Sequence, residues 1–309
     1  MIRKKTVHCE KGTIRQKIIH CGKGTKTRYR EIDIYYYKKT VRGRGDRKNK
    51  SRPEQEKLND KNARRYINQL VKANFFENDY RVDLTYDDEY LPRNEEEANK
   101  LVNNFLKKIK RERAKLGLGP LRYIWINEGF DGEGRPHHHL LINGGLSRDA
   151  IEGMWVKGRG KNAKKIGYTC AERLHFNNEG IVGLVKYMTK QALKEENRKS
   201  GATEGQLTLA DASDGDITMA DLLGDGVPGG KKRWKQSKNL VKPHERTRDR
   251  AYSNKEIRKI ISCPPDCEDT KKLFESRYEG YALDTCRFEH NEVTGLWSIY
   301  LTMHRKEDG

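Results

Sequence analysis

Three consecutive histidines, His137, His138 and His139, stand in a short apolar segment near the middle of the chain. On a β-strand successive side chains point to opposite faces, so His137 and His139 would share a face while His138 points away. Glu128 ends the preceding apolar run, across the glycine-rich segment 129–135. If the two runs pair antiparallel, a carboxylate joins two imidazoles, and this ligand set binds a divalent cation with positions left for water and phosphate. The alternative is a chance cluster of histidines on an exposed strand.

A second set of reactive groups lies in 178–195, where apolar residues recur at helical spacing. Tyr187 and Lys190 are three residues apart and would share a face of this helix, with Lys186 beside them. A tyrosine can act as a covalent nucleophile where a metal polarises a phosphate and a cation stabilises the developing charge. The alternative is structural, because most tyrosines lie in a core or on a surface and most lysines are solvated.

The elements that must position these groups follow from the pattern of residues 78–195. The strands expected from alternating or apolar runs are 80–86, 121–128, 136–143 and 167–175. The helices expected from apolar residues at helical spacing and from the capping residue Ser147 are 94–116, 147–155 and 178–195. This order predicts an α+β fold in which helices pack on one face of a central, mostly antiparallel sheet.

The charge balance points to a polyanionic partner. The 309 residues contain 64 Lys and Arg against 45 Asp and Glu, a formal net charge of +19, and nucleic acid is the commonest intracellular polyanion. No run of apolar residues exceeds four, which excludes a membrane helix and a signal peptide. Six cysteines without such a signal are typical of reduced thiols. A soluble, cytoplasmic protein is expected.

Charge is unevenly distributed. Residues 1–65 hold 22 basic and 7 acidic residues, and a His-Cys-x-Lys-Gly-Thr unit at 8–13 recurs at 20–25. The repeat predicts short strands with glycine turns, or a zinc site together with Cys263 and Cys267. Residues 31–37 are expected to form a strand. Residues 202–230 contain six acids and no Lys or Arg, which indicates a flexible insertion or linker.

The end of the chain is basic again from 231 to 235 and then predicts a hairpin. Its two strands are expected at 281–289 and 296–303, joined through Asn291 and Gly295.

Three segments, in this order, resemble the HUH endonucleases, and among them the rolling-circle replication initiators of phages and plasmids. They are residues 82–92 (VDLTYDDEYLP), Glu128 with 134–141 (GRPHHHLL), and 185–190 (VKYMTK). The resemblance implies a ferredoxin- or RRM-like endonuclease core at 75–198. A basic region at 1–74, an acidic linker at 199–230 and a basic, partly β-structured region at 231–309 would surround it.

The resemblance also implies the roles of individual residues. His137, His139 and Glu128 would bind Mg²⁺ or Mn²⁺, Tyr187 would attack a DNA phosphate, and Lys190 would help to position phosphate or metal. The expected DNA-binding residues are Thr85, Lys186, Arg233 and Lys235. The partners would be single-stranded origin DNA, a host polymerase and a host helicase, since the chain has no G-x-x-x-x-G-K-[ST] loop. The oligomeric state is left open.

Two positions depart from the family's pattern. His138 is polar where the family usually has an apolar residue, which implies either a less buried strand face or a role for another imidazole. Gly183 stands four residues before Tyr187, where two-tyrosine relatives carry a second nucleophile. Termination would then use water, a second molecule or another tyrosine.

Two rival interpretations remain. Other HUH enzymes fit less well, because relaxases carry the tyrosine before the histidine motif and transposases of this type are usually shorter. A non-catalytic nucleic-acid-binding protein with incidental histidines is the rival from a different class. Metal-dependent nicking of a single strand separates it from an enzyme.

Overall fold

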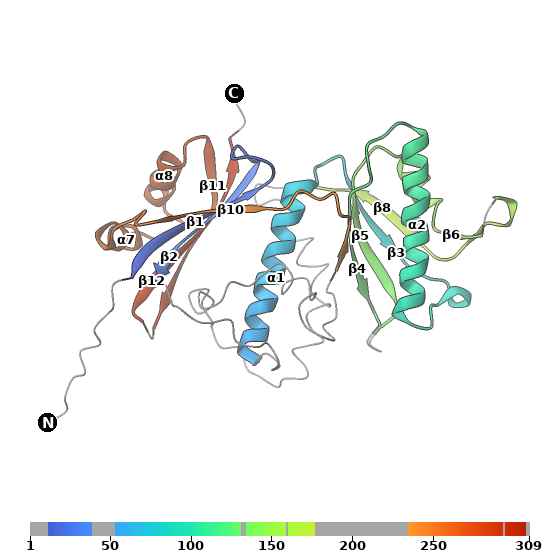
Figure 1. The fold of residues 1–309 in the computed structure, drawn as a ribbon, viewed down its shortest axis with the longest axis horizontal. Coiled ribbons are helices and arrows are strands. Elements are labelled where there is room, and N and C mark those ends of the chain that lie inside the picture. Colours follow the sequence, from blue (N-terminus) through green and yellow to red (C-terminus); the bar gives the residue numbers. More distant parts are fainter. Residues whose placement is uncertain are drawn as a thin grey trace. The chain divides into compact units, whose positions relative to one another are not determined.

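A computed structural model describes residues 12–38, 53–130, 134–158, 160–176, 234–292 and 294–306; for 53–60 it describes only the backbone (Figure 1). The chain divides into two compact units. Within the described residues, unit 1 comprises 12–38 and 243–306, and unit 2 comprises 59–176 and 234–242. The expected helix 178–195, the acidic stretch 202–230 and the first copy of the repeated unit, apart from Gly12 and Thr13, lie outside the described residues.

Unit 1 is a five-stranded antiparallel sheet in the order β10-β1-β2-β12-β11. Its strands are β1 (Thr13–Cys21), β2 (Tyr29–Tyr37), β10 (His244–Asp249), β11 (Tyr281–Asn291) and β12 (Leu296–Arg305). The second copy of the repeated unit, 20–25, ends β1 and forms the turn into β2. The predicted strand at 31–37 and the terminal hairpin are confirmed, and Gly295 donates its N–H to the carbonyl oxygen of Asn291 at 2.7 Å.

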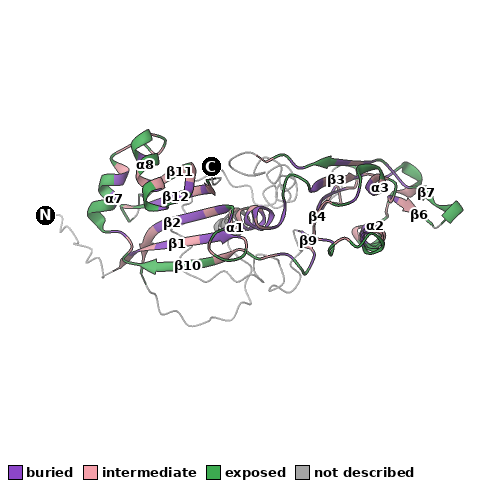
Figure 2. Ribbon diagram, turned by 90° about the horizontal axis from the view of Figure 1, so that it is seen from above, coloured by how far each residue is buried: buried purple, intermediate pink, exposed green. Residues whose placement is uncertain are grey.

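Two short helices, α7 (Asn254–Ile261) and α8 (Glu268–Arg277), cover one face of this sheet (Figure 1). Ile257, Ile260 and Phe274 from the helices pack against an apolar stripe that includes Ile32 and Leu301 of the central strands. Burial of this apolar area holds the unit together. The edge strand β10 is largely exposed (Figure 2).

Unit 2 is a second five-stranded antiparallel sheet in the order β8-β3-β5-β4-β9. Its strands are β3 (Tyr80–Leu84), β4 (Tyr123–Glu128), β5 (His137–Ile142), β8 (Thr169–Arg173) and β9 (Lys235–Gln236). The four strands predicted from 78–195 are β3, β4, β5 and β8. The remaining short elements are η1 (Asp88–Tyr90), α3 (Arg148–Glu152), β6 (Val156–Lys157), η2 (Gly160–Asn162) and β7 (Lys164–Lys165). The α+β class with antiparallel sheets is confirmed.

Helix α2 (Glu95–Lys115) covers one face of this sheet, as expected from its amphipathic sequence. Its N-cap Asn94 accepts a hydrogen bond from the N–H of Glu97 at 2.9 Å, which satisfies a free N–H of the first turn. Val102, Phe105 and Ile109 lie on its buried face. They pack in one cluster with alternate residues of β3 and β5.

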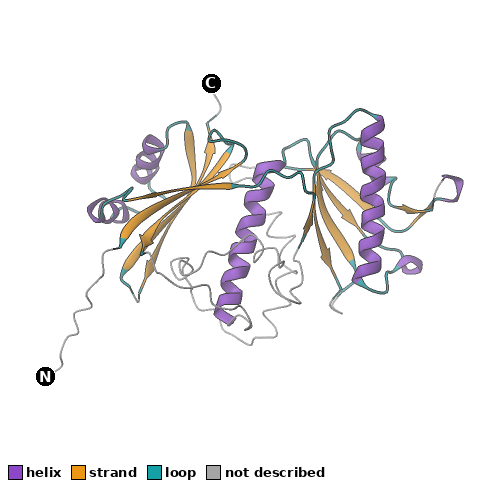
Figure 3. Cartoon of the chain, in the orientation of Figure 1, coloured by secondary structure: helices purple, strands orange, loops and turns teal. Residues whose placement is uncertain are grey.

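Helix α1 (Pro53–Asn74) covers the opposite face of the sheet (Figure 3). Ile67, Leu70 and Val71 pack against Ile124 and Leu141 of the central strands. The expectation that helices cover one face only is therefore wrong. The first half of this helix is almost entirely polar, so the sequence offered only a short apolar stripe that could signal it.

None of the helices within the described ranges combines the length and the hydropathy that crossing a bilayer requires.

Candidate metal centre

The β4–β5 hairpin brings Glu128 and His137 into direct register. His139, two residues further along β5, shares the face of His137, and the two rings lie 5.0 Å apart and perpendicular to each other. Gly129 allows the tight turn, because it adopts φ of 77° and an added Cβ would lie 2.4 Å from the carbonyl oxygen of Arg135. The antiparallel pairing inferred from the sequence is thus present.

One ligand atom from each of Glu128, His137 and His139 lies within 4.8 Å of the other two. Glu128 Oε2 is 3.0 Å from His137 Nε2 and 3.4 Å from His139 Nε2. In the part of the chain that the structure describes, this is the one group of three such side chains close enough to hold a metal ion. We call these three residues the triad.

Hydrogen bonds at the far side of each ring fix which nitrogen faces Glu128. His137 Nδ1 donates to the carbonyl oxygen of Arg135 at 2.9 Å, and His139 Nδ1 donates to Asp83 Oδ1 at 2.6 Å. A carbonyl or carboxylate oxygen only accepts, so both protons sit on Nδ1. Both Nε2 atoms are therefore turned toward the Glu128 carboxylate, as in histidines that bind a metal through Nε2.

The charges of the triad are coupled. Burial acts to lower the pKa of His139, but its bonds to Asp83 and Glu128 outweigh burial and raise that pKa to about 9. The bond to Glu128 raises the pKa of His137. Burial acts to raise the pKa of Glu128, but the two histidines outweigh it and lower the pKa. The site therefore concentrates an ionised carboxylate and cationic imidazoles, which a bound dication would replace.

Asp83 was not selected from the sequence, although it stands among the residues that resemble the family. It lies opposite His139 in the β3–β5 register and is held in turn by the guanidinium of Arg81. The signal was available in the strand pattern, because Arg81, Asp83 and Thr85 alternate with apolar residues and so share one face. Only the register could show which histidine Asp83 reaches.

His138 points to the opposite face and is completely buried among aromatic rings of Tyr86, Trp125, Phe130 and Trp155. The expectation of a less buried strand face is wrong. Burial lowers the pKa of His138 far below its usual value, so this ring is neutral.

Hydrogen bonds determine the tautomer of His138. The Asn127 amide donates to Glu95 and Asn99, so its oxygen accepts the His138 Nδ1 proton at 2.7 Å. The Nε2 atom therefore accepts from the Tyr86 hydroxyl at 2.6 Å. His138 satisfies buried polar groups and does not face the triad.

The remaining expected site residues are distributed as follows. Thr85 follows β3 near the triad, and its hydroxyl contacts the backbone of Tyr168. The Lys235 amine lies 4.4 Å from the centre of the Trp125 ring, on the sheet face opposite the triad. Tyr187, Lys190, Lys186 and Arg233 lie outside the described residues.

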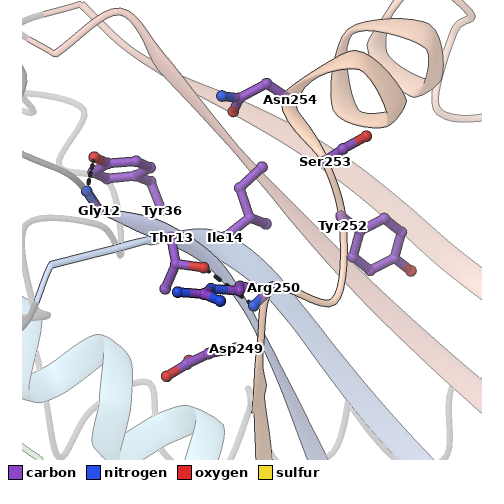
Figure 4. A pocket seen from close by; sticks show the side chains of 9 residues that line it. All are labelled: Gly12, Thr13, Ile14, Tyr36, Asp249, Arg250, Tyr252, Ser253 and Asn254. Carbon is purple, nitrogen blue, oxygen red and sulfur yellow. Dashed lines mark hydrogen bonds between the residues drawn. The ribbon is translucent and has the colours of Figure 1, made fainter.

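A cavity of about 610 Å³ lies in unit 1, between the start of β1 and the start of α7 (Figure 4). Its polar groups bond to one another: the Gly12 N–H donates to the Tyr36 hydroxyl, and the Arg250 N–H donates to Thr13. Its one carboxylate, Asp249, pairs with Arg15. The described residues that line it include no histidine or cysteine, so it lacks the ligands of a metal centre.

The triad fits a divalent cation. Glu128 Oε1 is buried and has no hydrogen-bond partner among the described residues, although a buried carboxylate oxygen ordinarily has one. Two imidazoles and a carboxylate suit Mn²⁺ and similar divalent ions, and a carboxylate with water suits Mg²⁺. The triad can thus supply three ligands and leave further positions for solvent and substrate.

Residues 79–192 match the family model of the replication-associated protein ORF2. The matched segment runs from β3 past β8 and contains the triad and Asp83; beyond the described residues it also contains Tyr187 and Lys190. No curated protein matches the chain, and no solved structure matches it. The family match supports a replication initiator of the Rep type.

Proposed function

We propose that this protein is a rolling-circle replication initiator that nicks and rejoins single-stranded DNA through a covalent tyrosine intermediate. The observation that carries the proposal is the convergence of Glu128, His137 and His139 on one face of the sheet. The family match supports it independently, because the matched segment includes both the triad and Tyr187.

In this proposal the triad holds Mg²⁺ or Mn²⁺. When bound, such a cation withdraws charge from a non-bridging phosphate oxygen and orients the phosphate. Asp83 keeps the Nδ1 proton of His139 in place, so that Nε2 presents its lone pair to the cation. The Arg135 carbonyl does the same for His137.

The proposed reaction is a transesterification. The Tyr187 oxygen forms a bond to phosphorus and loses its proton, while the bond from phosphorus to the 3′-oxygen breaks and that oxygen takes up a proton. The products are a 5′-phosphotyrosine and a free 3′-hydroxyl. One phosphodiester replaces another, so rejoining requires no nucleotide. The ordinary pKa of tyrosine is about 10, so the phenol is neutral at pH 7 and needs activation.

Other residues take supporting roles in the proposal. Lys190 positions phosphate or metal. Thr85, Lys186, Arg233 and Lys235 are proposed DNA contacts, with the basic N-terminal region supplying further phosphate contacts. A host polymerase would extend the 3′-hydroxyl, and a host helicase would unwind the duplex.

The test is incubation of the full chain with end-labelled single-stranded DNA of random sequence and Mn²⁺, followed by mass-spectrometric mapping of any modified residue. The proposal expects a DNA adduct on Tyr187 that EDTA abolishes. Tyr187→Phe should bind DNA equally well and form no adduct.

Adduct formation by Tyr187→Phe would remove this tyrosine from its role. Absence of both nicking and adduct in the unmodified protein, with DNA binding intact, would favour the non-catalytic alternative. A relaxase or transposase activity would appear as transfer of the bound strand to a different DNA end without replication.

A further inference from the structure

Tyr168 is an aromatic residue beside the triad that the proposed chemistry does not use. Its side chain is 63% exposed, the largest exposed fraction among the large hydrophobic side chains of the described residues. Single exposed aromatics are common and need no special role. Tyr168 differs because its backbone is fixed on both sides and its place on the sheet is determined.

Thr85 fixes the backbone of Tyr168 through three hydrogen bonds. The Thr85 N–H donates to the Tyr168 carbonyl at 2.9 Å, the Thr85 hydroxyl donates to the same oxygen at 3.2 Å, and the Tyr168 N–H donates to the Thr85 hydroxyl at 3.1 Å. The preceding residue, Gly167, passes so close that an added Cβ would lie 2.0 Å from the Thr85 carbonyl oxygen. The exposed ring is therefore mounted on a rigid support.

The register places this ring on the face of the triad. Cys170 pairs with Asp83, and Asp83 pairs with His139, so these three side chains share one face of the sheet. Tyr168, two residues before Cys170, lies on the same face, and its hydroxyl bonds to the Cys170 thiol. Adjacent strands are about 4.8 Å apart, so β8 lies about 10 Å from β5.

A basic hairpin leads directly into Tyr168. Strands β6 and β7 are joined through residues 158–163, and the hairpin projects from the rest of unit 2 (Figures 1 and 2). Residues 156–165 contain five Lys and Arg and no acid. Lys157, Lys161, Lys164 and Lys165 are all exposed. No ion pair involves these four lysines within the described ranges, so they are available to phosphates.

We propose that Tyr168 and the lysines of the β6–β7 hairpin form a binding track for single-stranded nucleic acid that leads to the triad. One base stacks on the Tyr168 ring, and backbone phosphates contact Lys164 and Lys165. Exposed aromatic rings flanked by basic residues bind single strands in this way, because every base has a stacking face. The choice of DNA as the strand rests on the proposed function. Thr85 then acts on DNA indirectly, as a positioning residue for Tyr168.

The test measures binding of a fluorescein-labelled DNA single strand of about 20 nucleotides, longer than one binding site, by fluorescence anisotropy. EDTA is present, so neither metal nor nicking contributes. Loss of one stacked base costs about 1–3 kcal/mol, so Tyr168→Ala should weaken binding about 5- to 150-fold. Tyr168→Phe keeps the ring and should bind normally. Phe76→Ala removes another exposed aromatic, four residues before the opposite end of β3, and should have no effect.

Salt dependence separates the two parts of the track. Tyr168→Ala should leave the slope of log K against log salt unchanged, because stacking releases no counterions. The double variant Lys164→Ala/Lys165→Ala should reduce that slope by about 1.4, from about 0.7 per phosphate on a single strand. Duplex DNA should bind Tyr168→Ala and the unmodified protein equally, since its bases are not free to stack on the ring.

Unchanged single-strand affinity in a folded Tyr168→Ala protein would overturn the inference, and so would an equal loss of duplex binding. Circular dichroism and the normal behaviour of Tyr168→Phe establish folding. Nicking by the unmodified protein tests the proposed function separately. Weakened binding without any nicking would support the track and refute the nickase, and nicking with unchanged binding would do the reverse.

Discussion

The Asp83 carboxylate accepts the Nδ1 proton of His139 at 2.6 Å, from the strand next to the one that carries the histidine. Burial acts to raise the pKa of Asp83, but His139 and Arg81 outweigh it and keep the carboxylate ionised. A partner of this kind orients a metal-binding imidazole and makes its free nitrogen more basic.

Replacing Asp83 should therefore weaken metal binding without removing a ligand. We expect Asp83→Ala to lower the affinity for Mn²⁺ about 10- to 100-fold, the usual effect of losing such a partner. Isothermal titration calorimetry measures the affinity directly. Glu112→Ala, which removes an exposed carboxylate from α2, is the matched control and should bind Mn²⁺ normally. Equal affinity in both variants would show that Asp83 has no part in the site.

Metal binding should stabilise unit 2. A ligand that binds only the folded state at 100 times its dissociation constant adds about 2.7 kcal/mol to the free energy of unfolding. Mn²⁺ should therefore raise the thermal unfolding temperature, and excess EDTA should reverse the rise. His137→Ala removes a ligand and should abolish the response, whereas His290→Ala, in unit 1, should preserve it. A rise that persists in His137→Ala would place the metal elsewhere.

The buried His138 should contribute to stability rather than to chemistry. His138→Leu leaves the Tyr86 hydroxyl and the Asn127 oxygen without their partner in the core, and a buried unsatisfied group costs about 1–3 kcal/mol. We expect a loss of about 2–4 kcal/mol in urea unfolding, from two such groups. Adding Tyr86→Phe should recover part of this loss, because it removes one of the two unsatisfied groups. A double variant less stable than His138→Leu would contradict the proposed hydrogen-bond chain.

Unit 1 should lose stability in mild acid through His20. Burial, together with the charges of Arg30, His244 and Arg246, lowers the pKa of His20 to about 4. In the unfolded chain this pKa is about 6.5, so between pH 6.5 and 4 the unfolded state binds more protons and stability falls as the pH falls. Urea unfolding at pH 7.5 and pH 5 measures the effect. His20→Gln should reduce the difference, and an unchanged difference would assign it to other groups.

The local elements of unit 2 were predictable because their signals are local. Alternation in 80–86 and the amphipathic pattern of 94–116, with Asn94 as its cap, depend only on neighbouring residues. The β4–β5 hairpin was predictable for the same reason, since its two strands are joined by a short glycine-rich segment. The triad follows from this hairpin alone, which is why Glu128, His137 and His139 could be named in advance.

The long-range pairings had no such signal. In unit 1, β1 pairs with β10, and β2 pairs with β12, across more than two hundred residues of chain. Helix α1 covers a sheet whose strands all follow it in the sequence, and its polar first half concealed it. Such contacts depend on which apolar faces fit together in three dimensions, and side-chain periodicity carries no information about the partner.

The sequence by itself determined the ligand types, the pairing of Glu128 with His137 and the shared face of His137 and His139. Their spacing on one hairpin permits hardly any other arrangement. Only the tertiary structure decided that Asp83 holds His139, that His138 is buried among aromatic rings and that Tyr168 stands on the triad's face. Those relationships arise where β3 inserts between β5 and β8, because hydrogen-bonded register across separate strands sets them.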